Sequence, residues 1–252
     1  MFATLLLAFV QSMTEFLPIS SSGHLFLVSA CGISHHGLAM DVALHIGTLL
    51  AVLIYFYRDI FQMMLFKNMR LALLLAWATI PIIFVGLCFA PLIEHIVRAP
   101  VIVAICSIVF GILLWFVDAK SKANKTIQTM NFKDAFLIGC SQILALIPGV
   151  SRSGITMTMG RYLNIKREDC AHFSMLLSIP TILGAMMYVL YKNMTGDLNL
   201  PSMFELQVGI CAAACFGLLG ITFLMKWLKH ASFFIFAVYR IILGVLVLGY
   251  FL

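Results

Sequence analysis

The sequence predicts an all-α polytopic membrane protein, arranged as an inverted-topology repeat with two re-entrant helix-loop segments and about six full transmembrane helices. Three observations lead to this fold class: the composition, the lengths of the apolar segments and a pattern that occurs twice. Of the 252 residues, 63% are hydrophobic and only 10% are charged, and the mean hydropathy is +1.08. Soluble domains carry roughly 25% charged residues, so the composition excludes an ordinary soluble protein.

Six apolar segments approach the roughly 20 residues that a helix needs to cross a bilayer. We expect these transmembrane helices near residues 41–57, 70–90, 100–117, 170–191, 205–225 and 233–252. Two further segments, 2–29 and 134–160, are apolar but interrupted by proline, serine and glycine. Because no Lys or Arg precedes the first apolar run, we expect no cleaved signal peptide.

The two broken segments resemble each other. One contains "PISSSGH" from Pro18 and the other "PGVSRSG" from Pro148; both follow an apolar stretch with a glutamine, and both contain S-x-S-G. The order broken segment, span, basic loop, span, span also occurs twice. We therefore predict one integral membrane domain, 1–252, made of repeat one (1–118), a polar linker (119–133) and repeat two (134–252).

The distribution of basic residues predicts the topology. If both broken segments return to the side they entered, twelve basic residues share one side: Arg58, Lys67, Arg70, Lys120, Lys122, Lys125, Lys133, Arg161, Lys166, Arg167, Lys226 and Lys229. The opposite loops then hold only Arg98 and Lys192. A full crossing by 134–160 would change this split to eight and six, so the positive-inside rule favours two re-entrant segments. The same rule explains the net charge of +6 without a nucleic-acid partner.

Re-entrant segments in antiparallel repeats meet inside the membrane, where non-helical backbone must be buried in protein or line a cavity. We therefore expect the two S-x-S-G loops to face one cavity. The two basic residues outside the loops, Arg152 and Arg240, each cost roughly 2.5–3.5 kcal/mol on insertion scales. Arg152 has two interpretations, a structural ion pair with Glu15 or a functional cation. Arg240 lies near the start of its segment, so its side chain could instead reach the interface.

The residues around the two breaks suit a phosphate ligand. Gln11 and Glu15 share one helix face, and arginine with several hydroxyl groups recognises phosphate. The candidate phosphate-binding residues are Ser20, Ser22, Ser151, Ser153 and Thr156.

These residues also suggest a reaction. Glu15, with Gln11, could hold a divalent cation, and Ser21 or a water could attack phosphorus. His24 could act as general acid or base and Arg152 could stabilise the transferring phosphoryl group. Binding alone, for anion transport, stays open at this point.

Two motifs carry a resemblance to a known family. "QSMTEFLPISSSGH" (Gln11 to His24) and "PGVSRSGIT" (Pro148 to Thr156) resemble the signatures of the bacterial undecaprenyl-diphosphatase (bacitracin-resistance) family, and the resemblance covers nearly the whole chain. It implies an inner-membrane phosphatase that converts undecaprenyl diphosphate to the monophosphate for reuse in cell-wall synthesis and confers bacitracin resistance. It also implies dependence on Mg²⁺ or Ca²⁺ and a site facing the periplasm. A homodimer is possible, and the alternative function is a flippase of polyprenyl phosphate.

The resemblance also implies roles for single residues. Glu15 matches the second acid of the first motif, Ser21 the proposed nucleophile and His24 the essential histidine. Ser151, Arg152 and Thr156 match phosphate-binding positions of the second motif. Gln11 stands where many members have glutamate, and a neutral amide oxygen is a weaker metal ligand than a carboxylate.

Overall fold

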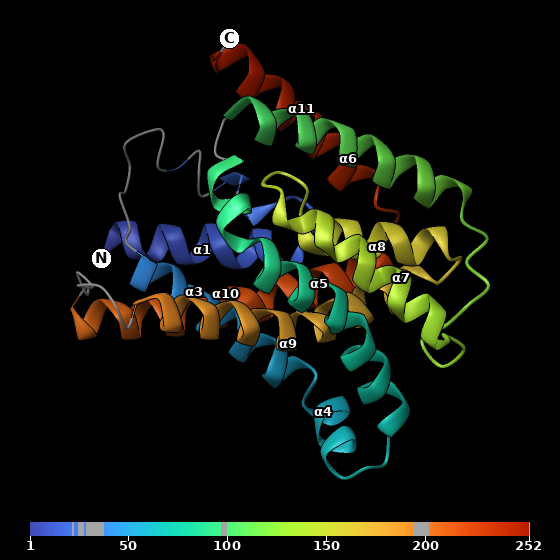
Figure 1. Ribbon diagram of the computed structural model, residues 1–252. Coiled ribbons are helices and arrows are strands. Elements are labelled where there is room, and N and C mark those ends of the chain that lie inside the picture. Colours follow the sequence, from blue (N-terminus) through green and yellow to red (C-terminus); the bar gives the residue numbers. More distant parts are fainter. Residues whose placement is uncertain (22, 25–27, 29–37, 97–99, 194–201, 252) are drawn as a thin grey trace.

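The computed structural model describes residues 1–251 except 22, 25–27, 29–37, 97–99 and 194–201. Apart from one isolated bridge between Lys125 and Ile165, the regular structure of these residues is helical. The α-helices are α1 (Phe2–Phe16), α3 (Leu38–Tyr55), α4 (Tyr57–Met64), α5 (Met69–Ile96), α6 (Pro100–Lys120), α7 (Phe132–Gln142), α8 (Arg152–Tyr162), α9 (Arg167–Asn193), α10 (Met203–Leu228) and α11 (Phe234–Phe251) (Figure 1). A 3₁₀ turn, η1 (Ile143–Leu146), follows α7.

The predicted membrane spans are confirmed. Among the described residues, five helices (α5, α6, α9, α10 and α11) are long and apolar enough to cross a bilayer, and the number rises to six when the bent pair α3 and α4 is counted as one span. This pair is bent by 78°, and α4 occupies most of a region that was expected to be a basic loop, 58–70. That expectation was wrong because Tyr57–Met64 mixes apolar and polar residues. Such a stretch forms an amphipathic helix suited to a membrane surface.

Contacts at the ends of the second broken segment confirm that it is re-entrant. Its two ends are the linker before α7 and the turn after α8. Lys125 N donates to Asn164 O and Lys166 N to Lys125 O, both at 2.9 Å. Hydrogen-bonded backbones must lie on the same side of the membrane, so α7 and α8 enter and return.

The first broken segment follows the same plan. Leu7 and Ala8, in the middle of α1, share one buried cluster with Met40 and Ala43 at the start of α3. Thr4, nearer the start of α1, and Met40 both lie beside Gly209 of α10. The chain therefore enters and leaves this segment at one end of the molecule. Figure 1 shows the N-terminus and the start of α3 on the same, left-hand side of the view.

In an inverted repeat, a contact between two helices of different repeats should occur a second time between their equivalents, with the repeats swapped. The helix contacts follow this pattern. Helix α1 packs on α10 as α7 packs on α5, and α3 packs on α10 as α9 packs on α5. Helices α6 and α11, which occupy the same place in the two repeats, lie side by side (Figure 1). The buried face of α10 carries Gly209, Ala213 and Gly217 at four-residue spacing. Small residues at this spacing let membrane helices approach closely.

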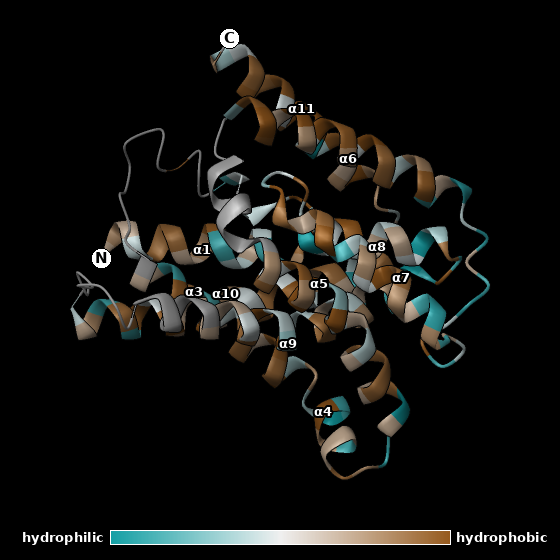
Figure 2. Cartoon of the chain, viewed as in Figure 1, coloured by the Kyte–Doolittle hydropathy of each residue, from teal (hydrophilic) through white to brown (hydrophobic). Residues whose placement is uncertain are grey.

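The surface has the polarity of a membrane protein. Figure 2 shows hydrophobic colour along α6 and α11, whereas hydrophilic colour gathers at the linker between α6 and α7. The exposed side chains of α6 and α11 include Ile105, Val109, Trp115, Ile242 and Leu246. Exposed apolar side chains of this kind suit contact with lipid, so the protein is a multi-pass membrane protein.

Candidate active site

Both halves of the chain line one cavity of about 410 Å³. Its polar lining residues are Gln11, Glu15, Ser21, Asp41, His45, Gln142, Arg152 and Thr181, and its apolar lining residues are Val42, Ile82, Ala145, Leu146, Ile182, Ala185 and Met186. The lining comes from α1, the turn after it, α3, α5, α7 with η1, α8 and α9. The predicted shared cavity between the two broken segments is therefore present in this structure.

Two serines make equivalent turns at the two breaks. Ser20 has φ 73° and Ser151 has φ 71°, both in the left-handed region that residues other than glycine rarely adopt. Ser151 is the N-cap of α8, and its hydroxyl accepts a hydrogen bond from Gly154 N at 3.1 Å. Strained backbone of this kind persists where the surrounding structure holds it, often at functional sites. These turns direct the next residues, Ser21 and Arg152, into the cavity.

A hydrogen-bonded group of three side chains occupies the cavity wall. Arg152 Nη2 lies 3.0 Å from Glu15 Oε1, and the Ser21 hydroxyl donates to Glu15 Oε2 at 2.8 Å. Arg152 Nη1 donates to the Ser174 carbonyl of α9 at 3.0 Å, which orients the guanidinium group. Glu15 is only 9% exposed, and a buried carboxylate needs such a partner. The structure thus joins three of the predicted catalytic residues.

Gln11 extends this group toward α3. Its Nε2 lies 3.3 Å from Glu15 Oε2 and 3.2 Å from His45 Nδ1. Its Oε1 is buried without a hydrogen-bond partner in the described part of the chain. Asp41 lines the same cavity. Oxygen atoms of amides and carboxylates are the ligands that Mg²⁺ and Ca²⁺ prefer, so Gln11, Glu15 and Asp41 fit a divalent cation by the chemistry of their donor atoms.

The hydroxyls of Ser153 and Thr156 are used inside the protein: Ser153 joins the two breaks and Thr156 joins α8 to α9. The Ser153 hydroxyl donates to Leu17 O at 3.0 Å, and Thr156 Oγ1 lies 2.7 Å from Ser174 Oγ. Ser20, Ser151, Ser153 and Thr156 are buried and are not among the residues that line the cavity. Direct phosphate binding by them stays a prediction. Ser22 lies outside the described residues. So does Arg98, which was counted in predicting the topology.

His24 is oriented toward α11. Its Nδ1 lies 2.7 Å from Ser20 O and its Nε2 lies 2.6 Å from the Tyr239 hydroxyl. Because the carbonyl can only accept, Nδ1 carries the proton and Nε2 of the neutral ring accepts from Tyr239. His24 does not line the cavity, so the expected pocket contains Glu15 and Arg152 without this imidazole. The predicted catalytic role of His24 stays a prediction.

Arg240 has a structural role that the sequence did not indicate. Its side chain is fully buried and its Nη2 donates to Gly149 O and Val150 O, both at 2.8 Å. It therefore does not reach the interface. Gly149, with φ +92°, lies so close to α6 that a Cβ atom would come within 2.4 Å of Val103 O. Arg240 and Gly149 together hold the turn that presents Arg152.

Sequence analysis missed several lining residues. Asp41, His45, Gln142 and Thr181 were not assigned to the site from the sequence. The glutamine before each break was the available signal for Gln142. His172, which follows Asp169 in α9 as His45 follows Asp41 in α3, is not among the lining residues; its Nε2 lies 3.2 Å from Asp59 Oδ2 and its ring stacks on Phe56.

Comparisons with known proteins agree with these motifs. The family model described as bacitracin resistance protein BacA matches residues 4–246. An undecaprenyl-diphosphatase of Alteromonas mediterranea is 40% identical over 99% of this chain and 98% of its own length. Those of Alcanivorax borkumensis and Desulforudis audaxviator are 42% and 41% identical, over 98% of this chain and 97% and 96% of their own lengths. The chain belongs to the bacitracin resistance protein BacA family.

Proposed function

We propose that this protein hydrolyses undecaprenyl diphosphate to undecaprenyl phosphate and inorganic phosphate, as the names of its relatives state for them. The observation that carries the proposal is the chain Ser21–Glu15–Arg152 inside a cavity with apolar walls. A hydroxyl that donates to a carboxylate beside an arginine is an arrangement for phosphoryl transfer. Transport of a lipid phosphate needs no such activated hydroxyl, and the relatives bear the name of a phosphatase, so a flippase is not favoured.

The geometry supports a serine nucleophile with Glu15 as its base. Ser21 Oγ attacks the terminal phosphorus, its proton passes to Glu15, and the bond between the terminal phosphorus and the bridging oxygen breaks. The lipid monophosphate leaves with that bridging oxygen. Water then hydrolyses the phosphoserine, releasing inorganic phosphate and restoring the Ser21 hydroxyl. Arg152 stabilises the negative charge on the transferring group in both steps.

A divalent cation, Mg²⁺ or Ca²⁺, completes the proposal. Glu15 and Asp41 would hold it, with Gln11 as a weaker ligand through its buried amide oxygen. When bound, such a cation neutralises charge on the phosphate oxygens.

The basic loops support the proposed location in the bacterial inner membrane with the site open to the periplasm. Helix α9 begins at Arg167 on the basic side, and the cavity touches Ala185 and Met186, more than halfway along this helix. The cavity therefore extends toward the side that the positive-inside rule places in the periplasm. A polyprenyl chain can remain in the bilayer while its diphosphate enters the cavity. A homodimer stays a prediction.

Release of inorganic phosphate from undecaprenyl or farnesyl diphosphate, by purified protein in detergent with Mg²⁺, tests the proposal. We expect Ser21→Ala, Glu15→Gln and Arg152→Ala each to lower kcat by roughly 100- to 1000-fold or more, the range seen when one charge-stabilising group is removed. The exposed Arg58→Ala is the matched control and should retain activity. Phosphate release that survives all three changes would refute the site, whereas lipid scrambling without release would indicate a transporter.

A further inference from the structure

A second buried glutamine faces the cavity. Gln142, the last residue of α7, is 0% exposed and lines the cavity. Its Oε1 lies 3.3 Å from Thr181 Oγ1 of α9. Its Nε2 has no hydrogen-bond partner among the described residues. A buried amide N–H group without a partner costs about 1–3 kcal/mol, so this donor is held ready for a ligand.

The repeat explains where this donor comes from. Gln11 precedes Ser20 by nine positions, Gln142 precedes Ser151 by the same nine, and both serines have left-handed backbone. The two glutamines thus occupy equivalent places ahead of the two breaks, and both line the same cavity. Gln11 Nε2 contacts Glu15 and His45. The equivalent nitrogen of Gln142 has no such partner and can serve a substrate.

A diphosphate needs such a donor. Its terminal phosphate presents several anionic oxygens, and Arg152 already donates to Glu15 and to Ser174 O. Two carboxylates, Glu15 and Asp41, also line the cavity and repel an anion. A neutral amide N–H group adds a hydrogen bond to phosphate without a further buried charge.

Resting on the proposed function, we propose that Gln142 is a substrate-binding residue whose Nε2 donates to a phosphate oxygen of the lipid diphosphate. Thr181 is its positioning residue. The Thr181 hydroxyl lies 2.8 Å from Leu177 O and 3.3 Å from Gln142 Oε1. When the Thr181 hydroxyl gives its single proton to Gln142 Oε1, the amide oxygen is held and the nitrogen is left as the free donor. A reversed amide would present an acceptor, which would favour a cation over a phosphate.

The test compares Gln142→Glu and Gln142→Met with the wild type, measuring kcat and KM for farnesyl diphosphate and the Mg²⁺ dependence. We expect Gln142→Met to lower kcat/KM by roughly 10- to 100-fold, the range for a hydrogen bond to a charged group. Gln142→Glu should raise KM further by repelling phosphate, with unchanged Mg²⁺ dependence. Gln62→Glu, an exposed glutamine of α4, is the control and should match the wild type.

Two further measurements separate binding from folding and from catalysis. Thr181→Val should raise KM with little change in kcat. In a Gln142→Met background the same change should have little further effect on KM. Thr181→Ser, which keeps the hydroxyl, should have the KM of the wild type. Binding of a methylene-bridged, non-hydrolysable farnesyl diphosphate analogue should weaken in Gln142→Glu even if the wild type proves to hydrolyse nothing. In that case the proposed hydrolysis fails, whereas binding of a lipid diphosphate by Gln142 is supported. Unchanged analogue affinity in both Gln142 variants, or tighter Mg²⁺ activation in Gln142→Glu, would overturn the inference.

Discussion

At the scale of single residues, two arginines have different roles around the second break. Arg152 lies between Glu15 and the Ser174 carbonyl, so its charge is paired with a carboxylate next to the proposed nucleophile. Arg240 has no carboxylate partner among the described residues and donates to the Gly149 and Val150 carbonyls instead. The first arginine is available for chemistry because its partner lies in the cavity. The second supports the backbone that carries the first.

We predict that Arg240→Met lowers both stability and activity. The Gly149 and Val150 carbonyls would lose their donor, and an unsatisfied buried polar group costs about 1–3 kcal/mol. Thermal unfolding in detergent and phosphate release would measure the two effects, with the exposed Arg58→Met as control. An unchanged melting temperature together with unchanged activity would show that Arg240 does not hold the turn.

At the scale of helices, one carboxylate connects four of them. Asp118, near the end of α6, accepts from Arg161 of α8 at 2.6 Å and from Arg167 of α9 at 2.9 Å. It also accepts from Phe233 N, directly before α11, at 3.2 Å. Asp118 and Arg161 are 4% and 1% exposed. This cluster ties the end of repeat one to repeat two on the basic side of the molecule.

We predict that Asp118→Ala destabilises the protein by about 3–5 kcal/mol, the typical cost of leaving one partner of a buried ion pair alone. The Lys125–Asp134 pair offers a comparison with one exposed partner, because the Lys125 side chain is 36% exposed and the Asp134 side chain 5%. Lys125→Ala should cost less than Asp118→Ala, since water reaches the lysine end of this pair. Denaturant titrations in detergent compare the two variants, and equal losses would argue against a special role for Asp118.

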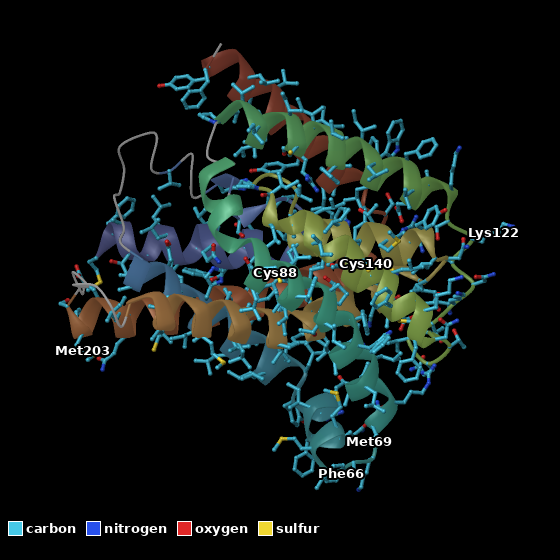
Figure 3. All side chains as sticks on the ribbon, in the orientation of Figure 1. Phe66, Met69, Cys88, Lys122, Cys140 and Met203 are labelled. Atoms are coloured by element: carbon cyan, nitrogen blue, oxygen red, sulfur yellow. The ribbon has the colours of Figure 1, made fainter. Side chains whose placement is uncertain are left out.

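At the scale of the whole molecule, the two repeats place opposite ends of the fold on opposite membrane faces. Figure 3 labels Lys122 at the right of the view, Phe66 at the lower tip beside the turn after α4, and Met203 at the left, at the start of α10. Lys122 and Phe66 belong to segments with several basic residues. Met203 comes after a connection between helices that has few basic residues. In the proposed orientation, Lys122 and Phe66 would face the cytoplasm and Met203 the periplasm.

Cysteine labelling checks this orientation. In a chain freed of its seven native cysteines, a membrane-impermeant maleimide applied to intact spheroplasts should label Met203→Cys. Lys122→Cys and Phe66→Cys should react only after permeabilisation. The reverse pattern would place the cavity toward the cytoplasm and contradict the proposed periplasmic site.

The spans and both breaks could be predicted from sequence because their causes are local. Apolar length predicts a crossing helix, and Pro, Ser and Gly predict a break. The cavity lining was predicted only in part, since a residue such as Thr181 looks like any other polar residue within an apolar helix. The tilt of α4 also escaped prediction, because a bend of 78° depends on the packing of its neighbours.

The sequence by itself determined the membrane class and the two similar breaks, since hydropathy and repetition are properties of the chain. It offered the pairing of Glu15 with Arg152 as one of two interpretations, and the structure shows that pair. Only the tertiary structure decided which side chains line the cavity. His24 hydrogen-bonds to Tyr239, the Ser153 hydroxyl joins the two breaks, and Thr156 contacts Ser174 of α9. Gln142 instead lines the cavity. The physical reason is that a side chain's direction depends on how α7, α8 and α11 pack, which involves residues more than a hundred positions away along the chain.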